Sequence, residues 1–240
     1  MAPSLLAGKT ALVTGASSGI GKALTHQLID EGVRVAMVGR DRGRLEQAAV
    51  GAAPETHLLL PCDVRDDAQV RSMVADVEAA WGRTDILVNG AGVYHAATLP
   101  DLTNEQWDDL WRTNVNGTLF PTRAVLPGML ARKHGFIVVL SSVAAHRSFA
   151  NMTGYGATKH AVTGFARALT NEVRQEGVRV VTVLSGPVDT PLWDGKSTPL
   201  ERADMLTPAE VARAIIHAMT VSDTQVLEEV LLLPQAGVYH

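Results

Sequence analysis

Short apolar runs rich in β-branched residues alternate with longer amphipathic stretches from one end of the chain to the other. Buried strands of a parallel sheet show such runs, and the helices that cross over the sheet show the amphipathic pattern. The alternation therefore predicts an α/β fold, in which helices cover both faces of a mainly parallel sheet. Strands are expected at residues 11–14, 34–39, 57–61, 86–89, 135–141, 179–184 and 225–233.

Length and charge limit what the chain can be. A chain of 240 residues with 46% hydrophobic residues can bury one sizeable core, so we expect a single domain over residues 1–240. The formal net charge is -4, and no run of Lys and Arg forms a basic tail. The sequence therefore gives no electrostatic reason for the protein to bind nucleic acid.

Other classes of protein are unsupported by the sequence. Cys62 is the single cysteine, so no internal disulfide can form, which favours a reducing compartment. The N-terminal segment has no signal-peptide pattern, and no apolar run approaches the ~18 residues of a membrane span. No His-x-x-x-His or Cys-x-x-Cys pair is present, so a metal site is unsupported. We expect a cytoplasmic protein without a membrane partner.

Capping residues mark two helices. Thr207 and Glu210 flank a proline in a capping box, which predicts a helix that ends near residue 219. Thr103 and Gln106 repeat the pattern before a long segment that reaches residue 133. Four residues of this segment disfavour a helix interior, and the last of them also lacks a backbone N–H, so we expect a kink there: Asn114, Asn116, Gly117 and Pro121. The least regular region, residues 189–206, is expected to form a lid over a binding site.

The first strand leads into residues 14–21, which read TGASSGIG, and a helix-forming stretch follows. Glycines in such a turn let the backbone approach a pyrophosphate closely. Free N–H groups at the start of the helix can bind the anion. Gly15, Gly19 and Gly21 therefore predict a phosphate site between a strand and a helix.

The same turn permits a second interpretation. Gly15, Ser17 and Gly19 satisfy the G-x-S-x-G pattern of a hydrolase nucleophile elbow, in the strand-turn-helix context that this motif requires. A serine esterase with Ser17 as nucleophile is therefore an alternative. Two observations count against it, because the elbow would lie on the first strand and Gly21 would have no role.

The motifs in combination resemble the classical short-chain dehydrogenase/reductase family, over residues 9–234. Four residues have the order and spacing of the catalytic tetrad of that family, including its Tyr-x-x-x-Lys pattern: Asn114, Ser142, Tyr155 and Lys159. The resemblance implies a three-layer, doubly wound Rossmann fold with a seven-stranded sheet. It also implies an oxidoreductase that transfers a hydride between a nicotinamide cofactor and a small molecule.

Three further segments carry the resemblance. Residues 14–21 match the glycine motif of the family in full. Residues 89–92 resemble its Asn-Asn-Ala-Gly motif, with Gly90 in place of the second Asn. Residues 185–190 resemble the segment after the sixth strand, with Ser185 where proline is usual. These two departures affect loops and leave the implied chemistry unchanged.

The resemblance makes Tyr155 the acid that protonates the alkoxide formed by hydride transfer. A tyrosine ordinarily titrates near ~10, and lowering its pKa by about two to three means a preference of roughly 3–4 kcal/mol for the phenolate. If a helix begins near Tyr155, the Lys159 ammonium lies on the same face and can supply this preference. The resemblance also assigns Lys159 to the nicotinamide ribose hydroxyls.

Ser142 and Asn114 complete the implied site. Ser142 follows an apolar strand, where a hydroxyl can donate to the substrate oxygen as charge develops. Ser141 is placed equally well, and Ser142 is chosen because it lies thirteen residues before Tyr155, as in the family. Asn114 is unusual inside a helix, because its amide competes for backbone hydrogen bonds. By resemblance it marks a helix irregularity whose carbonyl positions a water in a proton relay through Lys159.

The end of the second strand selects the cofactor in dinucleotide-binding folds, where an acid binds the ribose 2′-hydroxyl and an arginine binds a 2′-phosphate. Gly39 stands where NAD-selective members of the family have Asp, and Arg40 stands where NADP-selective members have Arg. NADP(H) is therefore the expected cofactor. NAD(H) is the second choice, because Asp41 could still reach the ribose.

The resemblance implies contacts along the whole site. The cofactor would contact Gly15, Ser17, Ser18, Gly19, Ile20, Arg40, Asp63, Val64, Asn89, Ala91, Gly92, Tyr155, Lys159, Gly186, Val188 and Thr190. The substrate would lie among Tyr94, His95, Ala144, His146, Met152, Leu192 and Trp193. Such a pocket is mainly apolar with one or two polar contacts, and it suits a mid-sized ketone, aldehyde or secondary alcohol.

Members of the family usually pair through two long helices, which correspond here to residues 104–133 and 155–175. A homotetramer or a homodimer is therefore expected. A non-catalytic sensor that binds NADP(H) is a further alternative to an enzyme. The complete tetrad counts against a sensor, because a sensor needs no acid.

Overall fold

Seven strands form one parallel sheet in the part of the chain that the structure, a computed structural model, describes: residues 4–196, 200–222 and 224–237. Their order is β3-β2-β1-β4-β5-β6-β7, and each pair of neighbours is parallel. The strands are β1 (Thr10–Thr14), β2 (Arg34–Gly39), β3 (His57–Pro61), β4 (Ile86–Asn89), β5 (Gly135–Leu140), β6 (Val178–Ser185) and β7 (Glu229–Leu232).

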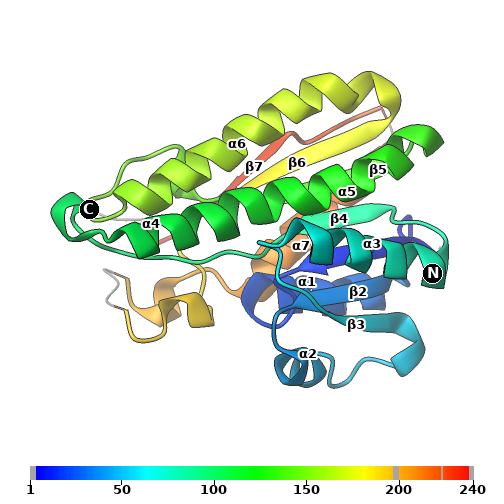
Figure 1. Cartoon of the computed structure of the whole chain (residues 1–240), viewed down its shortest axis with the longest axis horizontal. Coiled ribbons are helices and arrows are strands. Elements are labelled where there is room, and N and C mark those ends of the chain that lie inside the picture. Colours follow the sequence, from blue (N-terminus) through cyan, green and yellow to red (C-terminus); the bar gives the residue numbers. More distant parts are fainter. Residues whose placement is uncertain (1–3, 197–199, 223, 238–240) are drawn as a thin grey trace.

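Helices cover both faces of this sheet (Figure 1). One face carries α1 (Gly19–Asp30), α2 (Arg42–Ala48) and α7 (Pro208–Thr220). The other carries α3 (Asp67–Trp81), α5 (Gly117–Arg132) and α6 (Thr153–Val173), and α4 (Asn104–Leu110) precedes α5. Short 3-10 helices lie at Pro54–Thr56, Leu99–Asp101, Val143–Ala145, Arg174–Glu176, Pro191–Trp193 and Arg202–Asp204. The predicted three-layer, doubly wound fold is confirmed.

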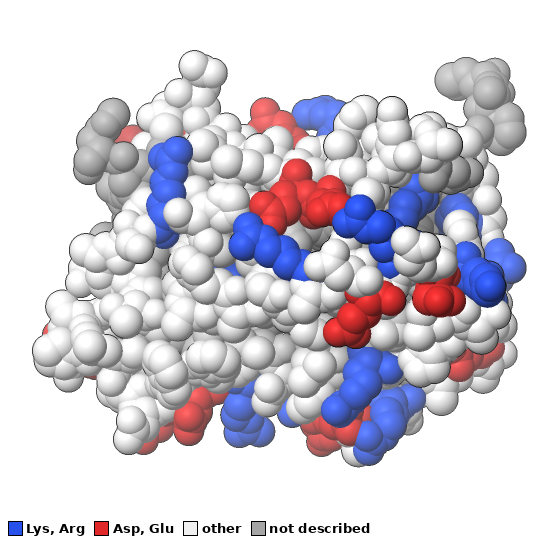
Figure 2. Space-filling model, turned by 90° about the horizontal axis from the view of Figure 1, so that it is seen from above, with Lys and Arg blue, Asp and Glu red and all other residues white. Residues whose placement is uncertain are grey.

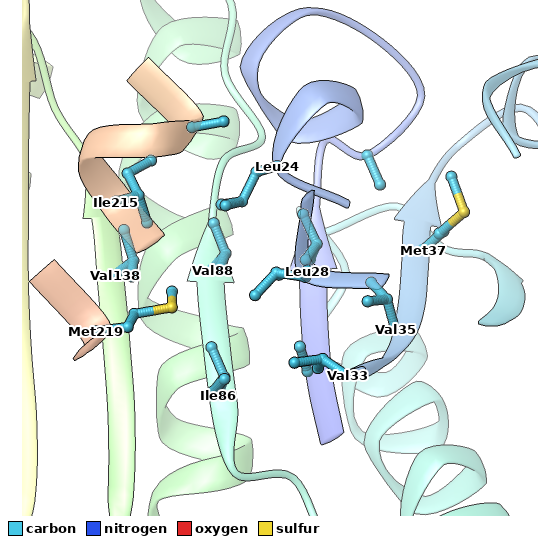
Figure 3. Packing of buried hydrophobic residues seen from close by; sticks show 14 of the residues in the cluster. Leu24, Leu28, Val33, Val35, Met37, Ile86, Val88, Val138, Ile215 and Met219 are labelled. Atoms are coloured by element: carbon cyan, nitrogen blue, oxygen red, sulfur yellow. The ribbon is translucent and has the colours of Figure 1, made fainter. Parts of the chain in front are cut away.

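Each helix layer buries an apolar stripe against the sheet. On the α1 and α7 side, Leu24 and Leu28 lie four residues apart on α1 and pack with Ile215 of α7 above Val88 of β4 (Figure 3). This spacing places them on one face of the helix, and full burial of such a side chain contributes roughly 1.5–3 kcal/mol.

No helix among the described residues is long and apolar enough to cross a membrane.

The strands agree with the predicted ranges to within one residue, with one exception. The strand predicted at 225–233 begins only at Glu229. Its pairing with β6 runs from Thr182 opposite Glu229 to Ser185 opposite Leu232. β7 lies at the edge of the sheet and pairs only with β6. The strand can therefore begin late, because no second neighbour forms hydrogen bonds with the residues before Glu229.

The segment predicted from Thr103 to residue 133 is helical, and its irregular turn lies before Pro121. A π-helical turn spans Trp111–Asn116, where the N–H of Gly117 donates to the carbonyl of Arg112, five residues back. α5 continues through Pro121. The π-helical turn gives way to α5 at Gly117. The Thr118 hydroxyl donates to the carbonyl of Asn114, before this boundary, and the Thr122 hydroxyl donates to the carbonyl of Thr118, after it.

The expected lid is described except for residues 197–199, which lie outside the described residues. Its two ends are held together at Val188 and Leu206, where Asp189 N donates to Leu206 O and Leu206 N donates to Pro187 O. Arg202 adds ion pairs to Asp189 at 2.6 Å and to Asp194 at 2.5 Å. These contacts position the segment above the carboxyl ends of β5 and β6.

Candidate active site

A cleft of about 560 Å³ runs along the carboxyl edge of the sheet. Its wall is built from residues that follow β1 to β6. The chain places β2 and β3 on one side of β1 and β4 to β7 on the other. The loops after β1 and β4 therefore diverge, and this is where ligands bind in open parallel sheets.

The turn after β1 passes very close to the loop after β4. Gly15 has a φ of +72°, and a Cβ atom there would lie 2.6 Å from Gly90 O. A Cβ atom on Gly90 would lie 2.7 Å from Thr14 O. The Thr14 hydroxyl accepts the N–H groups of Gly90 and Ala91 at 3.0 and 3.2 Å. Glycine at position 90, where the family has Asn, is thus required by the close approach of the two backbones.

The start of α1 offers free donors to this cleft. α1 begins at Gly19, and its N-cap residue, Ser18, makes no side-chain capping bond. The first N–H groups of a helix have no partner within the helix, so those of Gly19 and Ile20 lack a side-chain acceptor as well. Both residues line the cleft. The turn therefore fits the pyrophosphate of a dinucleotide.

Tyr155 and Lys159 lie four residues apart on α6, so their side chains share one face of the helix. The Lys159 Nζ atom is 5.6 Å from the centre of the Tyr155 ring and donates to Leu140 O at 2.9 Å. Burial of this ammonium lowers its pKa to about 8. The pair lies at the end of β5 and faces the cleft.

The structure separates the two candidate serines. The Ser141 hydroxyl is buried and bonds to Thr163 Oγ1 at 2.7 Å, so it points toward α6. The Ser142 Oγ atom accepts the N–H of Ala144 at 3.1 Å. That bond leaves the proton of Ser142 for another acceptor in the cleft, which is the property expected of a donor to a substrate oxygen.

Asn114 lies in the π-helical turn and behind the cleft wall. Its Oδ1 atom accepts from Val93 N at 2.8 Å, and its Nδ2 atom donates to Val93 O at 3.1 Å. Nδ2 also donates to Thr158 Oγ1 at 3.0 Å. The side chain is therefore buried and ties the loop after β4 to α6, rather than facing solvent. The proton relay through its carbonyl stays a prediction.

Three other predicted site residues do not lie on the cleft wall. Asn89 is buried, and its Nδ2 atom donates to Thr122 Oγ1 at 2.9 Å. The Nε2 atom of His95 lies 3.0 Å from an oxygen of Asp109. His146 is exposed and lies 3.5 Å from Glu229. The other predicted cofactor and substrate residues all line the cleft.

One end of the cleft, here named the aromatic end, is lined by Tyr94, Phe149, Met152, Leu192 and Trp193. The Tyr94 ring meets the Tyr155 ring edge-on, with centroids 5.0 Å apart, and lies 5.2 Å from the Trp193 ring. Phe149 was missed by the sequence analysis, because it lies in an irregular stretch without periodic signal. None of these five lining residues carries a charge. The Lys196 ammonium lies behind them, 5.2 Å from the centre of the Tyr94 ring, and donates to Leu192 O at 2.7 Å.

The opposite end, named the charged end, is lined by Arg40, Asp41, Arg44, Asp63 and Arg65. Arg65 bonds to Asp63 at 2.6 Å and holds the pKa of that carboxyl below its usual value. Cys62 lies beside them, and burial raises the pKa of its thiol to about 11. It therefore remains a protonated thiol, not a nucleophile. Arg44 and Arg65 were also missed by the sequence analysis.

The hydrolase interpretation finds no support in this geometry. Ser17 lines the cleft, but no histidine or carboxylate among the described residues forms a hydrogen bond with its hydroxyl. A nucleophilic serine needs such a base within hydrogen-bonding distance.

Known proteins resemble this chain in sequence and in fold. The profile of the short chain dehydrogenase family matches residues 9–201. An uncharacterized oxidoreductase of Staphylococcus haemolyticus is 35% identical over 95% of this chain and 98% of its own length. The closed form of a serine dehydrogenase complexed with NADP+ has a TM-score of 0.87 and 29% identity, over 96% of both chains. A metagenomic short-chain oxidoreductase in complex with NADP has a TM-score of 0.83 and 31% identity, over 96% of this chain and 98% of its own. The chain belongs to the short-chain dehydrogenase family of oxidoreductases.

Proposed function

We propose that this protein is an NADP(H)-dependent oxidoreductase that interconverts a small ketone or aldehyde and its alcohol, with Tyr155 as general acid and base. The observation that carries the proposal is the buried Lys159 ammonium, which lies 5.6 Å from the centre of the Tyr155 ring, in a cleft that Ser142 also lines. A buried ammonium next to a tyrosine favours the phenolate. A structural role alone gives no reason to bury this charge.

The cleft fits a nicotinamide dinucleotide. The close approach at Gly15 and the free N–H groups of Gly19 and Ile20 would hold the pyrophosphate, and the charged end would hold the adenosine. Two of the similar structures contain NADP, which supports this cofactor over NAD. When bound, the nicotinamide supplies or accepts the hydride.

Three side chains would then serve the substrate oxygen. Ser142 donates a hydrogen bond to it, because its Oγ atom already accepts the N–H of Ala144. Tyr155 gives its proton to the oxygen in reduction and takes it back in oxidation. Lys159 stabilises the phenolate that remains, and its bond to Leu140 O keeps the ammonium in place.

The aromatic end would take the organic groups of the substrate. His95 and His146 do not line the cleft, so the lining of this end is more apolar than the sequence predicts, with the Lys196 ammonium beside the Tyr94 ring as the nearby cation. An uncharged carbonyl compound with an aryl or bulky alkyl group suits it, because such a group buries apolar area without leaving a charge unpaired.

We also propose a homotetramer or homodimer that pairs through α4, α5 and α6. Trp107 of α4 is 37% exposed. Figure 2 looks onto the side of the molecule that α6 covers, and broad areas of it carry neither acidic nor basic side chains. Light scattering at several protein concentrations tests the assembly.

The test of the activity is NADPH consumption with a panel of aryl and alkyl ketones, by wild type and by Tyr155→Phe. Turnover by wild type, and none by a variant that still binds NADPH, supports the enzyme. Tight NADPH binding without turnover of any carbonyl or alcohol supports a sensor. Failure of both nucleotides to bind overturns the proposal, and ester hydrolysis by wild type and Ser17→Ala then becomes the next assay.

A further inference from the structure

Three arginines lie within five residues at the start of α2, and the structure gives them different surroundings. Arg42 points away from the cleft and pairs with Glu46 at 3.0 Å. Arg40 and Arg44 both line the charged end of the cleft. Among the described residues, neither of these two has an acidic partner within salt-bridge distance. Both guanidinium groups are therefore presented to the cleft without a bonded carboxylate.

Asp41 lies between them in sequence and also lines the cleft. Its Oδ1 atom accepts the backbone N–H of Arg44 at 2.9 Å and caps α2. This bond fixes the carboxylate at the helix start and places the backbone of Arg44 next to it. An acid that is engaged as a cap is less available to a ribose hydroxyl than a free one.

The local balance of charge depends on Arg44. Arg40 carries one positive charge and Asp41 one negative charge. Their effects on a phosphate bound in the cleft would largely cancel. Arg65 is bonded to two carboxylates, Asp63 at 2.6 Å and Asp109 at 3.2 Å, so it leaves no positive charge for a ligand. Arg44 is therefore a second cation, in addition to Arg40, that is not bonded to a carboxylate of the described residues. A dianionic phosphate placed there would meet two arginines and one carboxylate.

We infer that Arg44 is a second determinant of cofactor specificity, which binds the 2′-phosphate of NADP(H) together with Arg40. The inference rests on the proposed function, and it adds a residue that the family motifs did not indicate. Gly39 has no side chain to occupy the approach, and even a Cβ there would lie 3.3 Å from Leu45 Cδ2 and 3.5 Å from Ser17 Oγ. Two guanidinium groups suit a phosphate because each presents paired N–H donors.

The test is calorimetric binding of NADPH, NADH, and the pair adenosine 2′,5′-bisphosphate and adenosine 5′-monophosphate. The last two probes report the 2′-phosphate without requiring turnover. Arg44→Gln is expected to weaken NADPH and the bisphosphate by about 10- to 100-fold, the usual effect of losing a hydrogen bond to a charged group. NADH and the monophosphate should bind as in wild type, which also shows that the variant folds. Arg44→Lys should recover part of the loss.

Arg42→Gln is the matched control, because Arg42 is an arginine of the same turn that faces away. It should bind all four probes as wild type does. If Arg40→Gln removes the preference for NADPH and Arg44→Gln does not, the inference about Arg44 is wrong and the proposed cofactor stands. If wild type itself binds NADPH no better than NADH, the proposed cofactor and the inference are both wrong.

Discussion

The charged end and the aromatic end of the cleft are built on opposite principles. At the charged end, side chains of both signs come from residues that follow β2 and β3, and some of them pair with one another. At the aromatic end, rings and aliphatic side chains from the β4 loop, the start of α6 and the lid contact one another. Charges in contact with water bind a charged nucleotide reversibly, whereas an apolar wall strengthens the electrostatic effect of the buried Lys159.

The strongest test of this comparison removes the proposed acid, the Tyr155 hydroxyl, and leaves both ends of the cleft otherwise intact. Tyr155→Phe should lower kcat by about 10²- to 10⁴-fold, the usual contribution of general acid catalysis. The ring is retained, so its edge-on contact with Tyr94 should persist. NADPH affinity, measured by calorimetry, should equal that of wild type. If the variant keeps more than a tenth of the wild-type kcat, a group other than Tyr155 donates the proton to the substrate oxygen.

A second change tests the cost of the buried charge. Burial lowers the pKa of Lys159 from 10.5 to about 8, so the unfolded chain binds more protons between these pH values. The free energy of unfolding of wild type should therefore rise as the pH increases from about 8 to about 10.5, by roughly 3 kcal/mol. Lys159→Met should abolish both this rise and the activity.

Urea unfolding at pH 7 to 10.5 measures this effect, with Lys22→Met as the control at an exposed position. At neutral pH, Lys159→Met should be at least as stable as wild type, because it removes a buried ammonium and leaves only Leu140 O without its donor. Equal pH dependence in wild type and Lys159→Met would show that the ammonium is not buried in solution.

Trp193 tests the apolar character of the aromatic end. Trp193→Ala removes the ring that packs on Tyr94, and an aromatic contact of this kind is worth about 0.5–1.5 kcal/mol beyond its buried area. We expect kcat/KM for aryl ketones to fall about tenfold and that for acetone-sized ketones to change little. Leu5→Ala, at an exposed position near the N-terminus, is the control. An equal loss for both substrates would indicate a general effect on the lid.

Much of the fold and of the candidate site could be predicted, because local chemistry determines both. The capping box of Thr207 and Glu210 starts α7 where it is expected. Tyr155 and Lys159 share a helix face as their spacing requires. The helix irregularity that the resemblance implies at Asn114 lies in the π-helical turn Trp111–Asn116. Its bonding pattern could not be predicted, because it depends on contacts of Asn114 with Val93 and with Thr158 of α6, which lie far from it in the sequence.

At the charged end, too, the sequence alone did not determine which side chains line the cleft. Arg40, Arg42 and Arg44 are alike in sequence, and all three precede or begin the short helix α2. Which of them faces the cleft depends on the rotation of that helix about its axis, which the packing of Leu45 against the sheet determines. The resemblance to the family identifies Arg40, which the motif of the family contains. It does not identify Arg44, a neighbour that lines the same end of the cleft.

The smallest expected effect concerns the two histidines that were predicted to line the substrate pocket. His95 is held by Asp109, and His146 lies beside Glu229 and Arg167, so neither side chain is on the cleft wall. His95→Gln and His146→Gln should therefore each leave kcat/KM for an aryl ketone within about twofold of wild type, because a change outside the site alters few substrate contacts. Met152→Gln, which places a similar amide on the wall itself, should reduce it more. If either histidine variant lost activity as strongly as Met152→Gln, that histidine would have to turn into the cleft when substrate binds, and the aromatic end would be less apolar in the working enzyme than it is in this structure.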